Sequence, residues 1–369
     1  MRIGIARFFL ISVAVLAAGC ATTGGPPEIT LRDVGAPVWS VQHMNEKFQV
    51  ALSPAGRTLR LAGSAGLVLG TGVDVVVNAT YRDNIREMLG EDDTAGMLAE
   101  ALGERLDQAV AENLAQAAPL NTTVGYANRR EALAAWYEGL TRQGYDMLLE
   151  LRTRHGVYGH DGILAVRIDA RQVALPSGRT LWKDDIVVSL EPALAYARLG
   201  DPTARMSPRI RGARLTVERD VLEKWREGKG SLREDFVQTA EAAAAALVVS
   251  LGMAEDAVGE YYLGKCALNE KDFENSLFHF NEAIALDPEY ADVHNAISVA
   301  YAHQGNLDEA IEKAKTITEK WPEYGPAFMN LAWWYAMKKD DIPTARPFYQ
   351  RARELGMDPV KKLDERLSK

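Results

Sequence analysis

The sequence predicts a multidomain α+β protein, in which a mixed α/β layer domain is followed by an all-α solenoid of repeated helix pairs. Three observations favour this fold class: a 34-residue period after residue 256, apolar–polar alternation typical of strands between residues 145 and 190, and amphipathic stretches of helical period around those strands. Strands interspersed with helices are typical of a layered α/β domain. A length of 369 residues accommodates two or three such units.

The carboxy-terminal part of the chain repeats itself. Residues 257–290, 291–324 and 325–358 align as three copies, and the polar residues after them suit a capping helix that closes the solenoid within residues 257–369. The pattern resembles the tetratricopeptide repeat, a helix–turn–helix unit of about 34 residues. Matching first-helix positions carry the resemblance, namely Leu263, Ile297 and Leu331, each followed by a small residue at Gly264, Ser298 and Ala332.

The resemblance implies a concave face, lined mainly by first helices, that binds a protein or peptide partner. Trp333, with methionines near it, would anchor an apolar side chain of that partner; the alternative is that Trp333 packs under the capping helix. The groove positions carried over from the family are Tyr261, Lys265, Leu268, Asn269, Asn295, Val299, His303, Met329, Trp333 and Met337.

Residues 41–252 show no repeat and are expected to form the α/β domain, whose role the sequence does not identify. An antiparallel hairpin is predicted where an alternating segment turns at PSGR and returns. Its strands lie within residues 162–175 and 180–190, and a third strand is expected at 145–151. Helices are expected at residues 94–117, 129–142 and 231–251, the last opening with a capping box of Ser231 and Glu234.

The amino-terminal segment has the features of a secretory signal. A positive start precedes an apolar run at residues 8–18, which is shorter than the roughly 20 residues that a spanning helix needs. The sequence LAAGC, residues 16–20, resembles a bacterial lipobox, which implies that residues 1–19 are a lipoprotein signal peptide and that Cys20 is lipidated. The match departs at Ala17, where such boxes carry leucine. The alternative is an ordinary cleaved signal with an incidental cysteine.

Lipidation of Cys20 would anchor the protein to a membrane, because more than one acyl chain gives stable attachment. The chain has two cysteines, so Cys266 would then have no internal disulfide partner. The known sorting rules and Ala21 imply the outer membrane. We therefore expect residues 20–40 to form a lipidated tether, and the protein to be lipid-anchored at the periplasmic face of the outer membrane.

A glycine-spaced segment at residues 61–89 allows two interpretations. Gly66 and Gly70 lie four residues apart, which on a helix makes a flat face for close packing or for membrane contact. Asp74 interrupts the apolar run and favours close packing.

A basic stretch forms the second open case. Arginine binds phosphate and carboxylate bidentately, so an anion contact is one interpretation and a solvated loop is the other. The arginines concerned are Arg205, Arg209, Arg211 and Arg214.

Signals for enzyme chemistry are weak. His155, His160 and Asp161 have ligand-like spacing, but solvated histidines in a glycine-rich hairpin loop are the favoured interpretation. Nucleotide-binding, serine-hydrolase, zinc-protease and paired-cysteine motifs do not occur. The carboxylate pairs at residues 92–93 and 184–185 are expected in polar turns. The sequence therefore predicts no cofactor, no metal and no enzymatic activity, and the net charge of −9 argues against nucleic acid as a partner.

Together these features predict a lipid-anchored interaction scaffold that binds a partner protein or peptide in its repeat groove, in envelope assembly or export. One alternative is an envelope enzyme with its active site in the α/β domain. Another is a ring-forming component of an export apparatus, which would be a homo-oligomer. The α/β region is also faintly similar to the small domain of outer-membrane secretion lipoproteins, a resemblance without a chemical motif.

Overall fold

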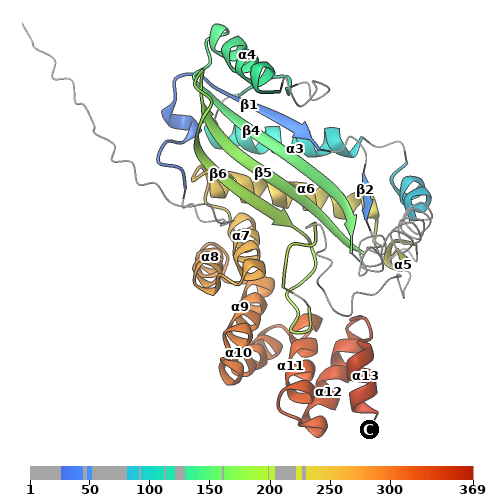
Figure 1. Ribbon diagram of the computed structural model, residues 1–369. Coiled ribbons are helices and arrows are strands. Elements are labelled where there is room, and N and C mark those ends of the chain that lie inside the picture. The colour runs from blue at the N-terminus through green and yellow to red at the C-terminus, as the bar shows by residue number, and fades with distance from the viewer. Residues whose placement is uncertain are drawn as a thin grey trace, which may run out of the picture.

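In the computed structural model, a mixed α/β domain is followed by a run of consecutive helices that form a solenoid (Figure 1). This arrangement confirms the predicted fold class. The structure describes residues 26–44, 48–51, 81–90, 93–111, 114–120, 129–159, 162–197, 199–203, 222–226 and 230–368. The predicted signal peptide, Cys20, the glycine-spaced residues 61–80 and the four arginines from Arg205 to Arg214 lie outside these residues.

The described strands form one mixed sheet in the order β3-β1-β4-β5-β6, with β2 also paired to β4. The neighbours of β4 on one side run parallel to it, whereas β4, β5 and β6 are antiparallel, which confirms the predicted hairpin. The strands are β1 (Pro37–His43), β2 (Gln49–Ala51), β3 (Ala115–Gln116), β4 (Met147–Tyr158), β5 (Ile163–Ala174) and β6 (Arg179–Val188).

Helices cover both faces of this sheet unequally. On one face, α3 (Thr94–Val110) and α6 (Leu232–Ser250) pack against the apolar side chains of β4 and β5. On the other face, α4 (Arg129–Arg142) covers one end, where Tyr137 and Leu140 meet Leu148 and Val173 (Figure 1). Short helical segments lie at η1 (Leu31–Asp33), α5 (Glu223–Arg226) and residues 81–89.

The helix expected at residues 94–117 is shorter than predicted. Ala111 adopts a left-handed conformation with φ 62° and ends α3. The Asp107 carboxylate then accepts a hydrogen bond from the Leu114 amide at 2.7 Å, and the next residues join the sheet as β3. Leu114 therefore lies outside the helix on which its apolar spacing had placed it.

Three helix pairs and a last helix form the solenoid. Gly264 allows the first pair to approach closely, since a Cβ there would lie 2.5 Å from the Phe280 ring. Leu363 and Leu367 of the last helix are buried in one cluster with the third pair. The helices are α7 (Ala257–Glu270), α8 (Phe273–Leu286), α9 (Ala291–Gln304), α10 (Leu307–Lys320), α11 (Gly325–Met337), α12 (Ile342–Glu354) and α13 (Lys361–Leu367).

Helix α6 belongs to both parts of the molecule. It packs against α3 and the sheet on one side and against α7 on the other. A Cβ at Gly259 of α7 would lie 2.5 Å from Val249 Cγ2 and 2.7 Å from the Ala245 carbonyl oxygen of α6. The two helices therefore approach as closely as a glycine permits, and α6 covers the first repeat. No helix among the described residues is long and apolar enough to cross a membrane.

Candidate functional site

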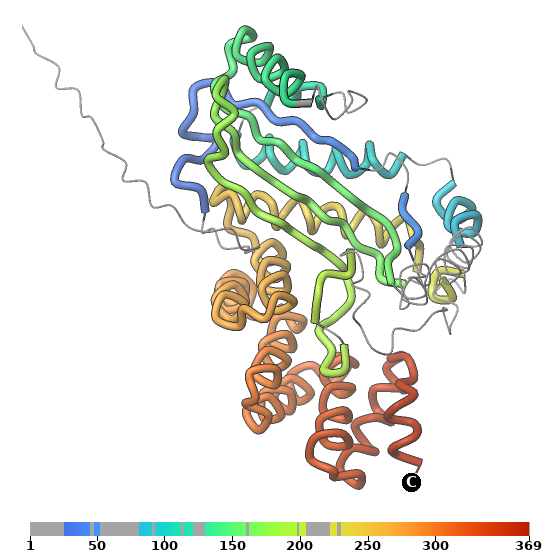
Figure 2. The backbone as a smooth tube through the Cα atoms, viewed as in Figure 1, coloured from blue at the N-terminus to red at the C-terminus, as the bar shows by residue number. Residues whose placement is uncertain are grey.

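A segment of the α/β domain occupies the concave face of the repeats. After β6 the chain runs from the sheet along the first helices α7, α9 and α11 before it turns back, as the tube in Figure 2 shows. We name residues 189–197 and 199–203 the groove loop. The groove on which sequence reasoning placed a partner thus holds part of the same chain.

Lys265 binds the first part of the groove loop. Its ammonium nitrogen donates hydrogen bonds to the carbonyl oxygens of Ser189 at 2.8 Å and Glu191 at 2.6 Å. The rings of Tyr261 and Tyr262 lie 5.3 and 5.0 Å from the same nitrogen. Burial lowers the pKa of Lys265 to about 8, against the opposing effect of nearby carboxylates. The lysine therefore binds main-chain oxygen atoms rather than an acidic side chain.

Two asparagines bind the middle of the groove loop. The amide nitrogens of Asn295 and Asn330 donate to the Ala193 carbonyl oxygen at 2.8 and 3.1 Å. The Asn330 side-chain oxygen accepts the Ala195 amide at 2.7 Å, and its nitrogen also donates to Asn295 at 2.9 Å. Both side chains are fully buried. Their polar atoms are therefore satisfied by the backbone of the groove loop and by each other.

Aromatic contact and polar contacts hold the far part of the groove loop. The ring of Tyr196 lies 5.6 Å from that of Trp333. Asn269 then accepts the Gly200 amide at 3.4 Å, and Asp201 forms an ion pair with Arg167 of β5 at 2.5 Å. Through the Asp201–Arg167 ion pair, the end of the groove loop lies against the sheet again.

The predicted groove residues fall into three groups. Four of them contact the groove loop directly, namely Lys265, Asn269, Asn295 and Trp333. Four are buried, namely Tyr261, Leu268, Val299 and Met329. His303 and Met337 are exposed. The side chain of Trp333 is half-buried and faces Tyr196, a neighbour that neither sequence interpretation included.

Asn330 was missed by sequence reasoning. The family's groove positions do not include it, and the equivalent positions of the other copies hold Tyr262 and Ala296. One signal could have found it: an asparagine within the apolar stretch of residues 327–336 must find hydrogen-bond partners if its helix is buried.

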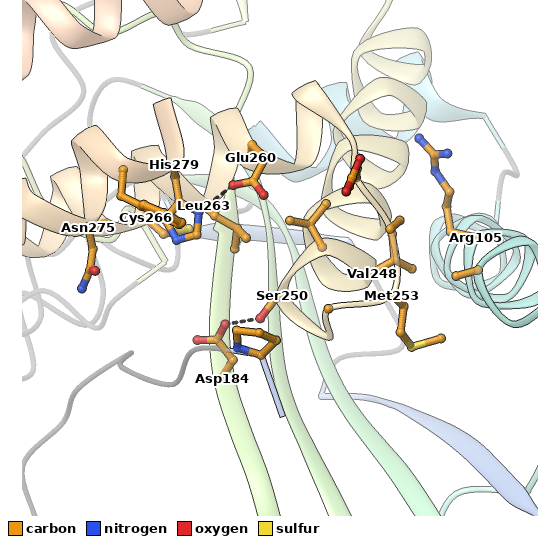
Figure 3. A pocket seen from close by; sticks show the side chains of 18 of the residues that line it. Arg105, Asp184, Val248, Ser250, Met253, Glu260, Leu263, Cys266, Asn275 and His279 are labelled. Atoms are coloured by element: carbon orange, nitrogen blue, oxygen red, sulfur yellow. Dashed lines mark hydrogen bonds and ion pairs between the residues drawn. The ribbon is translucent and has the colours of Figure 1, made fainter. Parts of the chain in front are cut away.

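A second concavity, of about 900 Å³, lies between the α/β domain and the first repeat (Figure 3). Its walls come from α3, β6, α6, α7 and α8. In it Ser250 donates a hydrogen bond to Asp184, and burial raises the pKa of that carboxyl. His279 Nδ1 lies 2.6 Å from Glu260 Oε2. Because the hydroxyl and the imidazole have different partners, these residues do not form an activated nucleophile and base.

Two groups of side chains on the walls of this concavity belong to the strand β6 and to its contact with α7. Asp184 and Asp185 lie in strand β6 rather than in a polar turn, because the hairpin strand continues through them. The Cys266 thiol exchanges hydrogen bonds with the main chain of Val187 at 3.3 Å, and burial raises its pKa to about 12. A reactive cysteine needs the opposite shift, so Cys266 joins α7 to β6 instead.

His155 lies in a strand rather than in a solvated loop, which corrects the sequence interpretation. It is fully buried in β4, where Nε2 is 2.9 Å from Thr94 Oγ1 and the ring contacts Phe48 and Phe236. Burial lowers its pKa to about 4. His160 and Asp161 lie outside the described residues. No group of side chains that could hold a metal ion occurs in the described part of the chain.

Comparisons with known proteins identify the repeats. A family model for the tetratricopeptide repeat matches residues 267–332. A search of curated proteins found no match. Among solved structures, a point mutant of MamA is 18% identical over 36% of this chain and 92% of its own, with a TM-score of 0.25. The dodecamer of a PelC variant from Paraburkholderia phytofirmans is 11% identical over 62% of this chain and 95% of its own, with a TM-score of 0.27. The chain therefore contains tetratricopeptide repeats, which are modules of protein-interaction scaffolds.

Proposed function

We propose that this protein is a lipid-anchored scaffold at the periplasmic face of the outer membrane, which holds a partner protein through its repeat groove during envelope assembly or export. One observation carries the proposal. The groove already binds a segment of the same chain through Lys265, Asn295 and Asn330, all of which contact main-chain atoms. Main-chain recognition does not depend on the sequence of the segment, so a segment of another protein can make the same hydrogen bonds.

The proposed anchor would keep the groove near the membrane. Pro26 lies six residues after Cys20, so the chain between them spans at most about 20 Å. Pro26 lies against Gly252, where the α/β domain joins the repeats. A lipid on Cys20 would therefore hold that junction close to the bilayer and raise the effective concentration of the groove for membrane-bound partners.

The proposal is tested by crosslinking in intact envelopes followed by recovery of the protein. We expect the wild type to recover one envelope protein, Trp333→Ala to lose it, and Cys20→Ala to recover less of it. Phe278→Ala is the matched control, because Phe278 is a 57% exposed aromatic residue of α8 outside the groove. Recovery of the same partner after Trp333→Ala would refute the groove as the recognition surface and would direct attention to the α/β domain.

A further inference from the structure

We infer that the groove loop is an intramolecular ligand that closes the repeat groove, and that a partner binds by displacing it with a peptide segment of the same chemistry. That segment would carry a small residue at the place of Ala193 and an aromatic residue three positions later, at the place of Tyr196. The inference rests on the proposed function for the existence of a partner. It adds the kind of segment that the partner carries and the requirement that the groove loop leaves before the segment binds.

The groove loop is held as a bound peptide would be. The carbonyl oxygens that the solenoid binds belong to Ser189, Glu191 and Ala193, and the bound amide that follows is that of Ala195. These are alternate residues. Two of these carbonyl oxygens converge on the Lys265 ammonium, and past Ala193 the Ala197 amide closes a turn on the Leu194 carbonyl oxygen at 3.0 Å. The first helices therefore bind the main chain of a segment that turns at its distal end.

The groove loop is not needed to keep the two parts of the molecule together. Helices α6 and α7 already join them through the close approach at Gly259, and Arg105 of α3 adds an ion pair of 2.8 Å with Asp256 at the start of α7. Those contacts do not involve the groove loop. Its release would therefore leave the domains attached and the groove open.

The groove is also suited to exchange of its occupant. When the groove loop leaves, water would hydrate the side chains of Lys265, Asn295 and Asn330. Each hydrogen bond to the groove loop is then replaced by one to water. Of the apolar side chains in the groove loop, Leu194 and Tyr196 are only half-buried where they pack against the third repeat. An opening of this kind belongs to the low-energy end of local unfolding reactions.

Two positions define the partner segment. Ala193 is buried, with its carbonyl oxygen between Asn295 and Asn330, so a small side chain suits that place. Three residues later Tyr196 lies against Trp333, so an aromatic side chain suits that place. Aromatic pairs of this kind are worth about 0.5–1.5 kcal/mol beyond the area they bury, which makes this position the main source of side-chain specificity.

The test uses a labelled peptide with the sequence of residues 189–203, SLEPALAYARLGDPT, and the full chain. In the variant Tyr196→Ser the groove loop loses its aromatic contact, so the groove is open more of the time. Apparent affinity falls with the fraction of molecules that are competent to bind. We expect the peptide to bind Tyr196→Ser at least about tenfold more tightly than it binds the wild type. A peptide with alanine in place of the tyrosine should bind more weakly to both.

Two further variants control this experiment. Asn330→Ala in the Tyr196→Ser background removes a groove side chain and should weaken peptide binding about tenfold. Phe278→Ala in the same background changes an exposed aromatic residue outside the groove and should leave binding unchanged. Equal affinity of the peptide for the wild type and for Tyr196→Ser would overturn the inference, as would an affinity that Asn330→Ala leaves unchanged.

Hydrogen exchange keeps the inference testable if Tyr196→Ser does not fold. In the wild type, an excess of the peptide should raise amide exchange in residues 189–197 and leave exchange in α6 unchanged. Unchanged exchange in residues 189–197 at saturating peptide would overturn the inference.

The envelope experiment separates the two proposals. Equal partner recovery by the wild type and by Tyr196→Ser, with no peptide binding, would retain the scaffold and reject the closing role of the groove loop. Peptide binding without any recovered partner would retain the closing role and reject the scaffold.

Discussion

Two of the contacts between the α/β domain and the repeats differ in their chemistry. At the first, α6 and α7 pack so closely that the Cβ of any residue other than glycine at Gly259 would meet the backbone of Ala245 and the side chain of Val249. At the second, hydrogen bonds from Lys265 and the groove asparagines bind the backbone of the groove loop. The first contact excludes water from apolar surface, whereas the second consists mainly of polar groups that water can also satisfy.

The two contacts therefore have different roles. The apolar contact makes α6 an additional helix at the start of the solenoid and joins the repeats to the α/β domain. On the proposal made above, the polar contact opens without breaking that junction. Variants at the first contact should therefore change global stability, and variants at the second should change access to the groove.

The largest expected effect is that of Gly259→Ala at the α6–α7 contact. The new Cβ would lie 2.7 Å from the Ala245 carbonyl oxygen, which is backbone and cannot rotate away. Overpacking of this kind costs about 3 kcal/mol of unfolding free energy at the upper end of its usual range. Urea denaturation followed by circular dichroism measures the change.

Gly139→Ala is the matched control for that variant. Gly139 lies in α4, and a Cβ there would meet nothing within 4 Å. Because alanine favours helix over glycine, we expect a gain of up to about 1 kcal/mol. If Gly259→Ala were as stable as the wild type, the α6–α7 contact would not be the tight junction described above.

The second largest effect is a loss of stability at low pH, which tests the packing of α6 on the sheet. His155 packs on Phe236 of α6, and burial lowers its pKa from 6.5 to about 4. Between these pH values the unfolded state binds a proton that the folded state excludes. The contribution of His155 to the free energy of unfolding is therefore fully present above pH 6.5 and is lost as the pH falls toward 4. We expect a loss of about 2 kcal/mol between pH 7 and pH 5, measured by urea denaturation at each pH.

Variants at two histidines identify the source of that pH dependence. His155→Gln should flatten the dependence, whatever it does to stability at pH 7. His294→Gln, at a half-buried position of α9, should retain it. A slope that persists in His155→Gln would assign the acid sensitivity to another group, such as His43, whose pKa burial also lowers.

These elements show which parts of the molecule local sequence patterns can predict. The hairpin of β5 and β6, helix α4 and the repeat helices each depend on a periodicity within one segment, and all are present in the structure. His155 shows the limit of such patterns. Glycines beside it indicate a loop, but Gly156 is required because β2 approaches there, with Gln49 oxygen 2.2 Å from where a Cβ would be.

The groove shows the same limit on a larger scale. Family positions locate residues that contact the occupant, but the groove loop itself has no period, and its hydrogen bonds to the repeats join residues 69 to 137 positions apart. No local pattern records contacts of that range. Asn330 completes the site from a position that the repeat pattern assigns to packing.

A smaller effect is expected at the polar contact. Asn330→Ala removes hydrogen bonds to Ala193 and Ala195 of the groove loop. Hydrogen bonds of this kind contribute about 1 kcal/mol each, so the free energy of opening the groove loop should fall by about 1–2 kcal/mol. Amide exchange in residues 189–197 should rise about tenfold, since about 1.4 kcal/mol corresponds to a factor of ten. Asn281→Ala, on the exposed surface of α8, should change neither quantity. Unchanged exchange in Asn330→Ala would mean that the asparagines do not hold the loop.

The smallest effect is expected from the charge of Lys265, whose ammonium binds the groove loop. Glu191 and Asp292 favour the Lys265 ammonium, but burial dominates and lowers the pKa from 10.5 to about 8. Opening of the groove exposes the ammonium to water and moves its pKa back toward 10.5, so closure becomes more favourable as the pH rises above 8. If the full reference value were regained, the gain from pH 7 to pH 9 would be about 1.3 kcal/mol, so protection of residues 189–197 should rise by up to roughly tenfold after correction for intrinsic exchange rates. Lys265→Met carries no titrating group and should show no rise. An equal rise in that variant would place the pH dependence elsewhere in the groove and would leave the Lys265 charge without influence on its opening.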